Sequence, residues 1–106
     1  MDTYVREFCP NGTHDKFYTD MTIREKFYSS LEFVVKRYAN EPTVLGWEVA
    51  NDPRCESTIP TSDQCDSNVI TQWIAATAQK IRSLDANHPI GSGYVPTPRS
   101  QMSAKS

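Results

Sequence analysis

One apolar segment rich in β-forming residues lies between two helical patterns, and this order limits what the chain can fold into. Residues 43–50 (TVLGWEVA) are bounded by Pro42 and by Asn51-Asp52-Pro53, which favours a short buried strand. A strand between helices implies βα units on a parallel sheet, and such a sheet needs several strands with helices over both faces. One strand cannot form it, so the sequence predicts an α/β segment of a larger domain.

The first helix is predicted from a capping signal and a periodic apolar face. Thr22 and Glu25 fit a capping box at its start, and it should end near Asn40. Glu32 and Lys36 are four residues apart on the polar side, which favours the same helix. The apolar residues at helical spacing are Ile23, Phe27, Leu31, Val34, Val35 and Tyr38.

The second helix is expected over residues 69–84, and Asn87-His88-Pro89 should stop it. Ile90 then begins another strand. The residues at helical spacing are Ile70, Trp73, Ile74, Thr77, Ile81 and Leu84. This periodicity makes Trp73 a core residue, and Trp47 in the strand is expected to be core as well.

Composition excludes several classes of function. The chain has 106 residues, of which 38% are hydrophobic and 23% charged, as expected for one small globular domain. A net charge of -2 without a basic face argues against nucleic-acid binding. No apolar run approaches the roughly 18 residues of a membrane span, and residues 1–16 contain no signal peptide.

Three cysteines and one tripeptide suggest covalent modifications. Residues 55–68 have the composition of a loop, which a disulfide between Cys55 and Cys65 could close, while Cys9 has no evident partner. Asn11-Gly12-Thr13 fits the N-glycosylation pattern, which matters only in a secreted protein. His14 and His88 are expected in loops, and neither belongs to a spaced cluster of metal ligands, so no metal site is predicted.

Residues 47–55 (WEVANDPRC) are similar to the fourth-strand signature of fungal endo-β-1,4-mannanases of glycoside hydrolase family five, usually WELANEPRC. Residues 14–20, 37–43 and 81–88 also resemble these enzymes. The resemblance covers residues 1–91, whereas residues 92–106 form a divergent tail that should be flexible. It implies part of a (β/α)8 TIM barrel: the segment around strand 4 with the flanking helices 3 and 4.

The resemblance also implies a function and site residues. The family hydrolyses β-1,4-mannosidic bonds in mannans with retention, without a cofactor and outside the cell. Asp52 stands at the position of the family's acid/base glutamate, and Asn51 matches the residue that hydrogen-bonds the sugar 2-hydroxyl. Cys55 and Cys65 match a family disulfide. Because the nucleophile comes from the seventh strand, the 106 residues are expected to be an incomplete and inactive fragment.

Other interpretations stay open at this point. Asn-Asp-Pro is an ordinary turn sequence outside this signature, and Glu48 is expected to be a structural partner rather than a second catalytic carboxylate. Arg54 could support the loop or be solvated. The enzyme could be a β-1,4-glucanase of the same superfamily, and the chain could be a sugar-binding remnant, an unrelated interaction domain or a truncated gene product.

Overall fold

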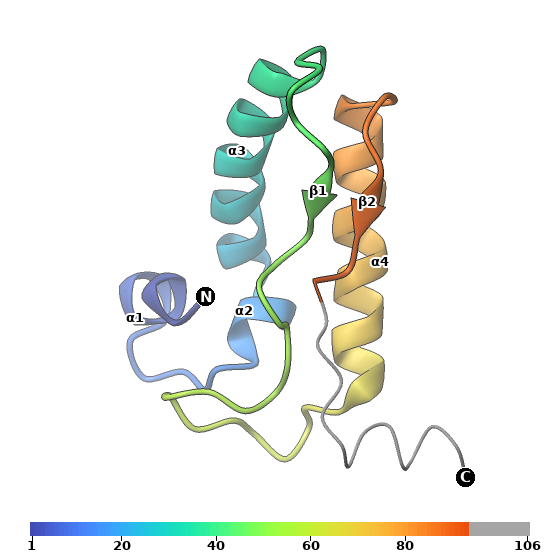
Figure 1. Ribbon diagram of the computed structural model, residues 1–106. Coiled ribbons are helices and arrows are strands. Elements are labelled where there is room, and N and C mark those ends of the chain that lie inside the picture. Colours follow the sequence, from blue (N-terminus) through green and yellow to red (C-terminus); the bar gives the residue numbers. More distant parts are fainter. Residues whose placement is uncertain (94–106) are drawn as a thin grey trace, which may run out of the picture.

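The computed structural model describes residues 1–93, and its centre is a parallel strand–helix–strand unit (Figure 1). Strand β1 (Trp47–Glu48) leads through a long loop into α4 (Ser67–Leu84), which returns the chain to β2 (Ile90–Gly91). The strands pair in parallel, with Trp47 opposite Ile90 and Glu48 opposite Gly91. Both strands run opposite to α4, so the predicted βα organisation is confirmed.

Strand β1 is much shorter than the predicted strand over residues 43–50. Its amide groups bond to one side only, with Trp47 N donating to the Pro89 carbonyl at 2.9 Å and Val49 N to that of Gly91 at 3.1 Å. Because no second strand lies along its other edge within residues 1–93, the ladder stays short. The predicted burial of residues 43–50 is confirmed for Val49 but wrong for Leu45, which is 92% exposed.

Helix α3 (Met21–Tyr38) confirms the first predicted helix but begins with a different cap. The Asp20 carboxylate accepts a hydrogen bond from Ile23 N at 3.0 Å, which satisfies an amide that the helix itself leaves open. Thr22 therefore lies inside the first turn, and the predicted capping box is wrong. The expected pair between Glu32 and Lys36 is present at 2.8 Å.

Two short N-terminal helices were not predicted: α1 (Asp2–Phe8) and α2 (Lys16–Thr19). Figure 1 places α1 beside the lower end of α3, and α2 between α3 and α4. Their aromatic residues pack with those of α3 and α4 in one cluster. Its members are Tyr4, Phe17, Tyr18, Phe27 and Trp73, with neighbouring ring centroids about 5 to 6 Å apart.

The predicted core face of α4 is confirmed. Its buried residues are Ile70, Trp73, Thr77 and Ile81. Trp73 is only 1% exposed and touches rings from α2 and α3. The buried Thr77 hydroxyl lies 3.0 Å from the hydroxyl of Tyr28, so the packed helices also share a polar contact.

A buried histidine fastens the end of α4 to the segment after α3. His88 Nδ1 donates to Asp85 at 2.6 Å, and His88 Nε2 lies 2.9 Å from the Glu41 carbonyl. Asp85 also accepts from Trp47 Nε1 at 2.7 Å. Burial opposes ionisation of Asp85, but these donors together lower its pKa. The hydrogen bond to Asp85 raises the pKa of His88.

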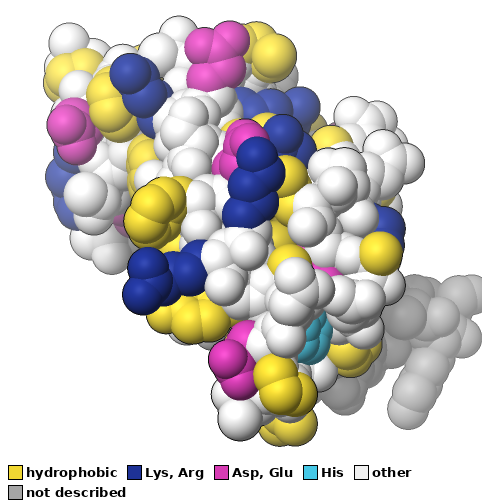
Figure 2. Space-filling model, turned by 90° about the horizontal axis from the view of Figure 1, so that it is seen from above, with side chains coloured by type: hydrophobic (Ala, Val, Ile, Leu, Met, Phe, Trp, Pro, Cys, Tyr) yellow, Lys and Arg dark blue, Asp and Glu magenta, His cyan; other side chains and the backbone are white. Residues whose placement is uncertain are grey.

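The described residues form a flat layer of 40 × 37 × 19 Å that leaves apolar groups in solvent. Phe33 is 69% and Met21 63% exposed. Figure 2, seen from the end where α3 and α4 finish, shows hydrophobic side chains between charged ones. None of the helices within residues 1–93 has the length and apolarity of a membrane span. The predicted tail, residues 92–106, falls almost wholly outside the described residues.

We expect the contribution of His88 to stability to depend on pH. Its folded pKa is raised above the ordinary 6.5, so its stabilisation is complete below pH 6.5 and is lost as pH rises through the folded pKa. The parent chain should therefore unfold at a higher denaturant midpoint than His88→Gln. The difference between the two midpoints should be largest at pH 6 and should shrink as the pH rises. Asp85→Asn removes the partner and should abolish this pH dependence; parallel curves for all three chains would contradict the assignment.

Candidate active site

A cavity of about 550 Å³ opens where β1 ends. Its walls come from α1, from His14, from the aromatic residues Phe17 and Phe27, and from the segment after β1. That segment contributes Val49, Ala50, Asn51, Asp52, Arg54, Glu56 and Ser57. Both residues singled out by the sequence, Asn51 and Asp52, therefore line the same hollow at the carboxyl end of a parallel strand. Ligands bind at this end of the strands in parallel α/β folds.

Asp52 has a backbone conformation that few side chains adopt. Its φ is 54°, in the left-handed region where Asp and Asn are enriched. Asp52 N donates to the Gly93 carbonyl at 2.8 Å, which fixes this turn against the segment after β2. A side chain at Gly93 would place its Cβ 1.7 Å from the Ala50 carbonyl oxygen, so only glycine permits this approach.

The Asp52 carboxylate forms an ion pair with a neighbour in its own loop. Arg54 Nη2 lies 2.7 Å from Asp52 Oδ2, and both side chains are about one-third exposed. A guanidinium at this distance stabilises the charged carboxylate. An acid that protonates a leaving group must carry a proton, so this contact works against such a role unless Arg54 moves.

The backbone of Arg54 is held by the buried Tyr18. The Tyr18 hydroxyl donates to the Arg54 carbonyl at 2.9 Å and accepts from Arg54 N at 3.1 Å. Burial raises the pKa of Tyr18 to about 12, so the hydroxyl remains a donor over the physiological range. His14 Nε2 lies 3.0 Å from the same Arg54 carbonyl.

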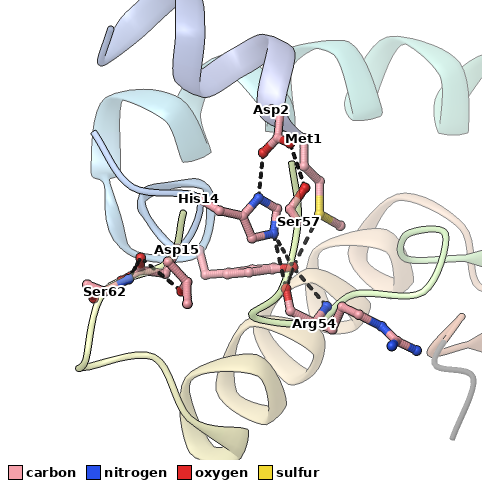
Figure 3. A network of polar contacts seen from close by, with 9 residues as sticks. Met1, Asp2, His14, Asp15, Arg54, Ser57 and Ser62 are labelled. Carbon is pink, nitrogen blue, oxygen red and sulfur yellow. Dashed lines mark hydrogen bonds and ion pairs between the residues drawn. The ribbon is translucent and has the colours of Figure 1, made fainter. Parts of the chain in front are cut away.

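A carboxylate from α1 orients His14. His14 Nδ1 donates to Asp2 at 2.5 Å, and Ser57 Oγ donates to the other oxygen of Asp2, also at 2.5 Å. Burial opposes ionisation of Asp2, but the bonds from Ser57 and His14 outweigh it and lower its pKa. Figure 3 shows these side chains converging from α1, the following loop and the loop after β1. The cavity wall is thus a connected polar network.

A second carboxylate anchors the far part of the long loop. Asp15 accepts from Ser62 N at 2.9 Å and from Ser62 Oγ at 2.6 Å, and also from Thr61 at 3.3 Å. Burial raises the pKa of Asp15, but hydrogen bonds, above all those from Ser62, overcome it and hold the value at about 2. The loop after β1 is therefore bound to the segment around α2 at Arg54, at Pro60 and at Ser62.

The same loop is closed by a disulfide between Cys55 and Cys65, with the Cα atoms 5.9 Å apart. This is the pairing expected from the sequence. Cys9 is a free cysteine, half-buried against Gly12. Within residues 1–93, no group of three or more His, Cys, Asp and Glu side chains gathers as a metal site.

The structure brings together some predicted residues and separates others. His14 and His88 both lie in loops, as predicted, but His14 lines the cavity while His88 lies near the end of α4. Glu48 is exposed and does not line the cavity with Asp52. Arg54 does support the loop, through both its side chain and its backbone.

Sequence reasoning missed Asp2, Tyr18 and Ser57. Asp2 and Ser57 are isolated polar residues with no motif around them. Tyr18 belongs to the segment 14–20 that resembles the mannanases, and this was the one signal that could have found it. Only the fold reveals that a helix residue, a loop histidine and a distant serine meet beside Asp52.

Comparison with known proteins assigns the family. The family described as "GH family 5 beta-mannosidase-like" matches residues 2–105. The chain belongs to this family. Its match extends past residue 91, where the resemblance found by sequence reasoning ends.

Two relatives of this glycoside hydrolase family 5 chain come from Podospora anserina and Aspergillus niger. Mannan endo-1,4-β-mannosidase A of Podospora anserina is 38% identical over 88% of this chain and 22% of its own length. The probable mannan endo-1,4-β-mannosidase A of Aspergillus niger is 37% identical over 85% of this chain and 21% of its own. The chain thus spans about a fifth of the curated relatives it matches.

Solved structures of the family share the fold of this segment. The endo-1,4-β-mannanase of Rhizomucor miehei superposes with a TM-score of 0.83 and 36% identity, over 89% of this chain and 29% of that one. The hyperthermostable endo-1,4-β-D-mannanase of Thermotoga petrophila superposes with a TM-score of 0.76 and 33% identity, over 89% of this chain and 27% of that one. These enzymes are TIM barrels, so the family 5 chain has the fold of part of such a barrel.

Removing the disulfide should destabilise the chain and loosen its long loop. We expect Cys55→Ser/Cys65→Ser to lower the free energy of unfolding by about 2–3 kcal/mol, because the open loop gains conformational entropy in the unfolded state. Chemical denaturation measures the loss, and limited proteolysis should cut between residues 55 and 65 first. Cys9→Ser is the control and should change neither result by much.

The Tyr18 hydroxyl should contribute to stability through Arg54. Tyr18→Phe keeps the buried ring but removes the group that bonds the Arg54 backbone, and we expect a loss of about 1–3 kcal/mol in denaturant unfolding. Tyr38→Phe makes the same change on a side chain that is 40% exposed, and it should cost under about 0.5 kcal/mol. Equal effects of the two substitutions would argue against the anchoring role.

Proposed function

We propose that these residues form the acid/base segment of an endo-β-1,4-mannanase, around strand 4 of its barrel with helices 3 and 4. The observation that carries this proposal is the position of Asn51 and Asp52, which line one cavity at the carboxyl end of β1. Relatives named mannan endo-1,4-β-mannosidases at 31–38% identity support the substrate class. The partner is then β-mannan or a related polysaccharide, and the reaction needs no cofactor.

The proposed chemistry requires two carboxyl groups about 5–5.5 Å apart, one to protonate the leaving oxygen and one to attack the anomeric carbon. By resemblance, Asp52 takes the first position, and Asn51 is placed to bond the sugar 2-hydroxyl. Asn51 is exposed to the cavity, so a sugar can reach it. The attacking carboxylate belongs to the seventh strand of the family barrel, outside this sequence.

Asp52 is a weak substitute for the family glutamate. Its carboxyl is one methylene nearer the backbone, and a displacement of about 1 Å can cost on the order of 100-fold in rate. Its ion pair with Arg54 at 2.7 Å also favours the charged form. Because the attacking carboxylate lies outside the 106 residues, we expect them alone to release no reducing sugar from mannan, also after Asp52→Glu.

Two further parts of the proposal concern organisation and location. We propose residues 1–91 as the barrel segment and residues 92–106 as a divergent extension. We propose an extracellular location, because a disulfide such as Cys55–Cys65 persists in oxidising compartments. Reagents that trap free thiols before lysis report whether this disulfide exists in the source organism.

A second candidate function is sugar binding without hydrolysis. The ion pair between Asp52 and Arg54 favours it, because it leaves the cavity open while holding the acid position charged. Retardation of the isolated chain in a mannan-containing native gel, without reducing-sugar release, would support this candidate. The nearest enzymatic alternative is a β-1,4-glucanase. It would be recognised by hydrolysis of cellulose in preference to mannan.

A chimera tests the acid/base assignment. Residues 1–93 would replace the matching segment of the Rhizomucor miehei endo-1,4-β-mannanase, whose structure superposes on them. We expect the chimera to hydrolyse mannan slowly and its Asp52→Glu variant to be faster by up to about 100-fold, because the longer side chain restores the reach of the carboxyl. Reducing-sugar release from mannan and from cellulose is the measurement.

Asp63→Glu is the matched control, since it adds the same methylene at an exposed loop position that does not line the cavity. It should leave the slow rate unchanged. If a folded Asp52→Glu chimera is no faster than its parent, Asp52 does not stand at the acid/base position. Faster hydrolysis of cellulose than of mannan would instead favour the glucanase.

A further inference from the structure

A turn between α1 and α2 displays the tripeptide Asn11-Gly12-Thr13. Gly12 N donates to the Cys9 carbonyl at 2.8 Å, which closes a four-residue turn. Asn11 is the third residue of this turn, at its tip, and its side chain is exposed. It does not line the cavity beside Asp52. The proposed active site therefore makes no use of this asparagine.

Packing explains why the middle residue of the tripeptide is small. A Cβ at position 12 would lie 2.6 Å from Cys9 Sγ and 3.1 Å from the Cys9 carbonyl oxygen, so a larger residue would push the turn open. The modification pattern N-x-[ST] excludes proline at the middle position, and Gly12 meets this condition. Among the asparagines of the chain, at positions 11, 40, 51, 68 and 87, only Asn11 satisfies that pattern.

We propose that Asn11 is an N-glycosylation site, whose glycan projects from the turn tip away from the cavity. This inference rests on the extracellular location included in the proposed function. The Asn11 side-chain nitrogen attacks C1 of an oligosaccharide carried on a lipid pyrophosphate. The N–C1 bond forms as the C1–O bond to pyrophosphate breaks, the lipid pyrophosphate leaves with the bonding electrons, and the amide loses one proton to a base.

The partial burial of Thr13 fits transfer to the nascent chain. In the folded protein Thr13 is half-buried within the loop. Before folding its hydroxyl is accessible for recognition, and after folding Asn11 remains in solvent while the rest of the loop packs. A bulky glycan at an exposed turn tip displaces no buried group.

The test is expression of the whole 106-residue chain in yeast behind a secretion signal, with intact mass measured before and after peptide N-glycosidase. We expect a heavier form from which the enzyme releases the glycan, leaving the bare chain with aspartate in place of Asn11. Release in heavy-oxygen water should place the label on residue 11. Both the secreted and the cell-retained chain are analysed, so poor export does not hide the result.

Asn11→Gln should abolish the heavier form, whereas Asn40→Gln, at an exposed asparagine outside the pattern, should retain it. Thr13→Ser keeps the hydroxyl that the pattern N-x-[ST] requires, so this variant should retain the modification. A wild-type chain that passes through the secretory route unmodified overturns the proposal. Because the export signal is supplied, that outcome would leave the proposed hydrolase function untouched.

Discussion

The burial of Trp73 is the contact on which the rest of the structure depends. Its indole packs from α4 against Phe17 and Tyr18 of α2 and against Phe27 of α3. This packing fixes the short α2, which could not be stable alone at four residues. With α2 in place, the Tyr18 hydroxyl reaches the backbone of Arg54 and thereby sets the loop that carries Asp52. A hydrophobic contact in the core thus positions polar groups at the cavity.

Asp52 is subject to two opposing demands. In the family signature, the carboxyl at this position exchanges a proton with a sugar oxygen. Its surroundings hold a guanidinium against it and keep its backbone in the left-handed region. A glutamate at this position would carry its carboxyl one methylene farther from the backbone. The difference between glutamate and aspartate therefore changes the reach of the carboxyl.

The two long helices could be predicted from the sequence because their signals are local, whereas the short α1 and α2 were missed. Periodic apolar residues and polar caps determine α3 and α4, and the segment 47–55 was enough to indicate the family. The length of β1 could not be predicted, since a strand extends only as far as its neighbours allow. The polar network could not be predicted either, because Asp2, His14 and Ser57 are far apart in the sequence and come together only in the folded chain. The cap at Asp20 was missed because Thr22 offered a competing motif.

The parallel pairing of β1 with β2 has a consequence for how the chain folds during synthesis. Trp47 meets Ile90 only after the long loop and all of α4 have left the ribosome. Contacts between residues so distant in sequence form slowly, because a large loop must close first. Cys55 and Cys65 are separated by only 10 positions and can meet much earlier. The covalent closure of the loop can therefore precede the strand pairing that aligns it.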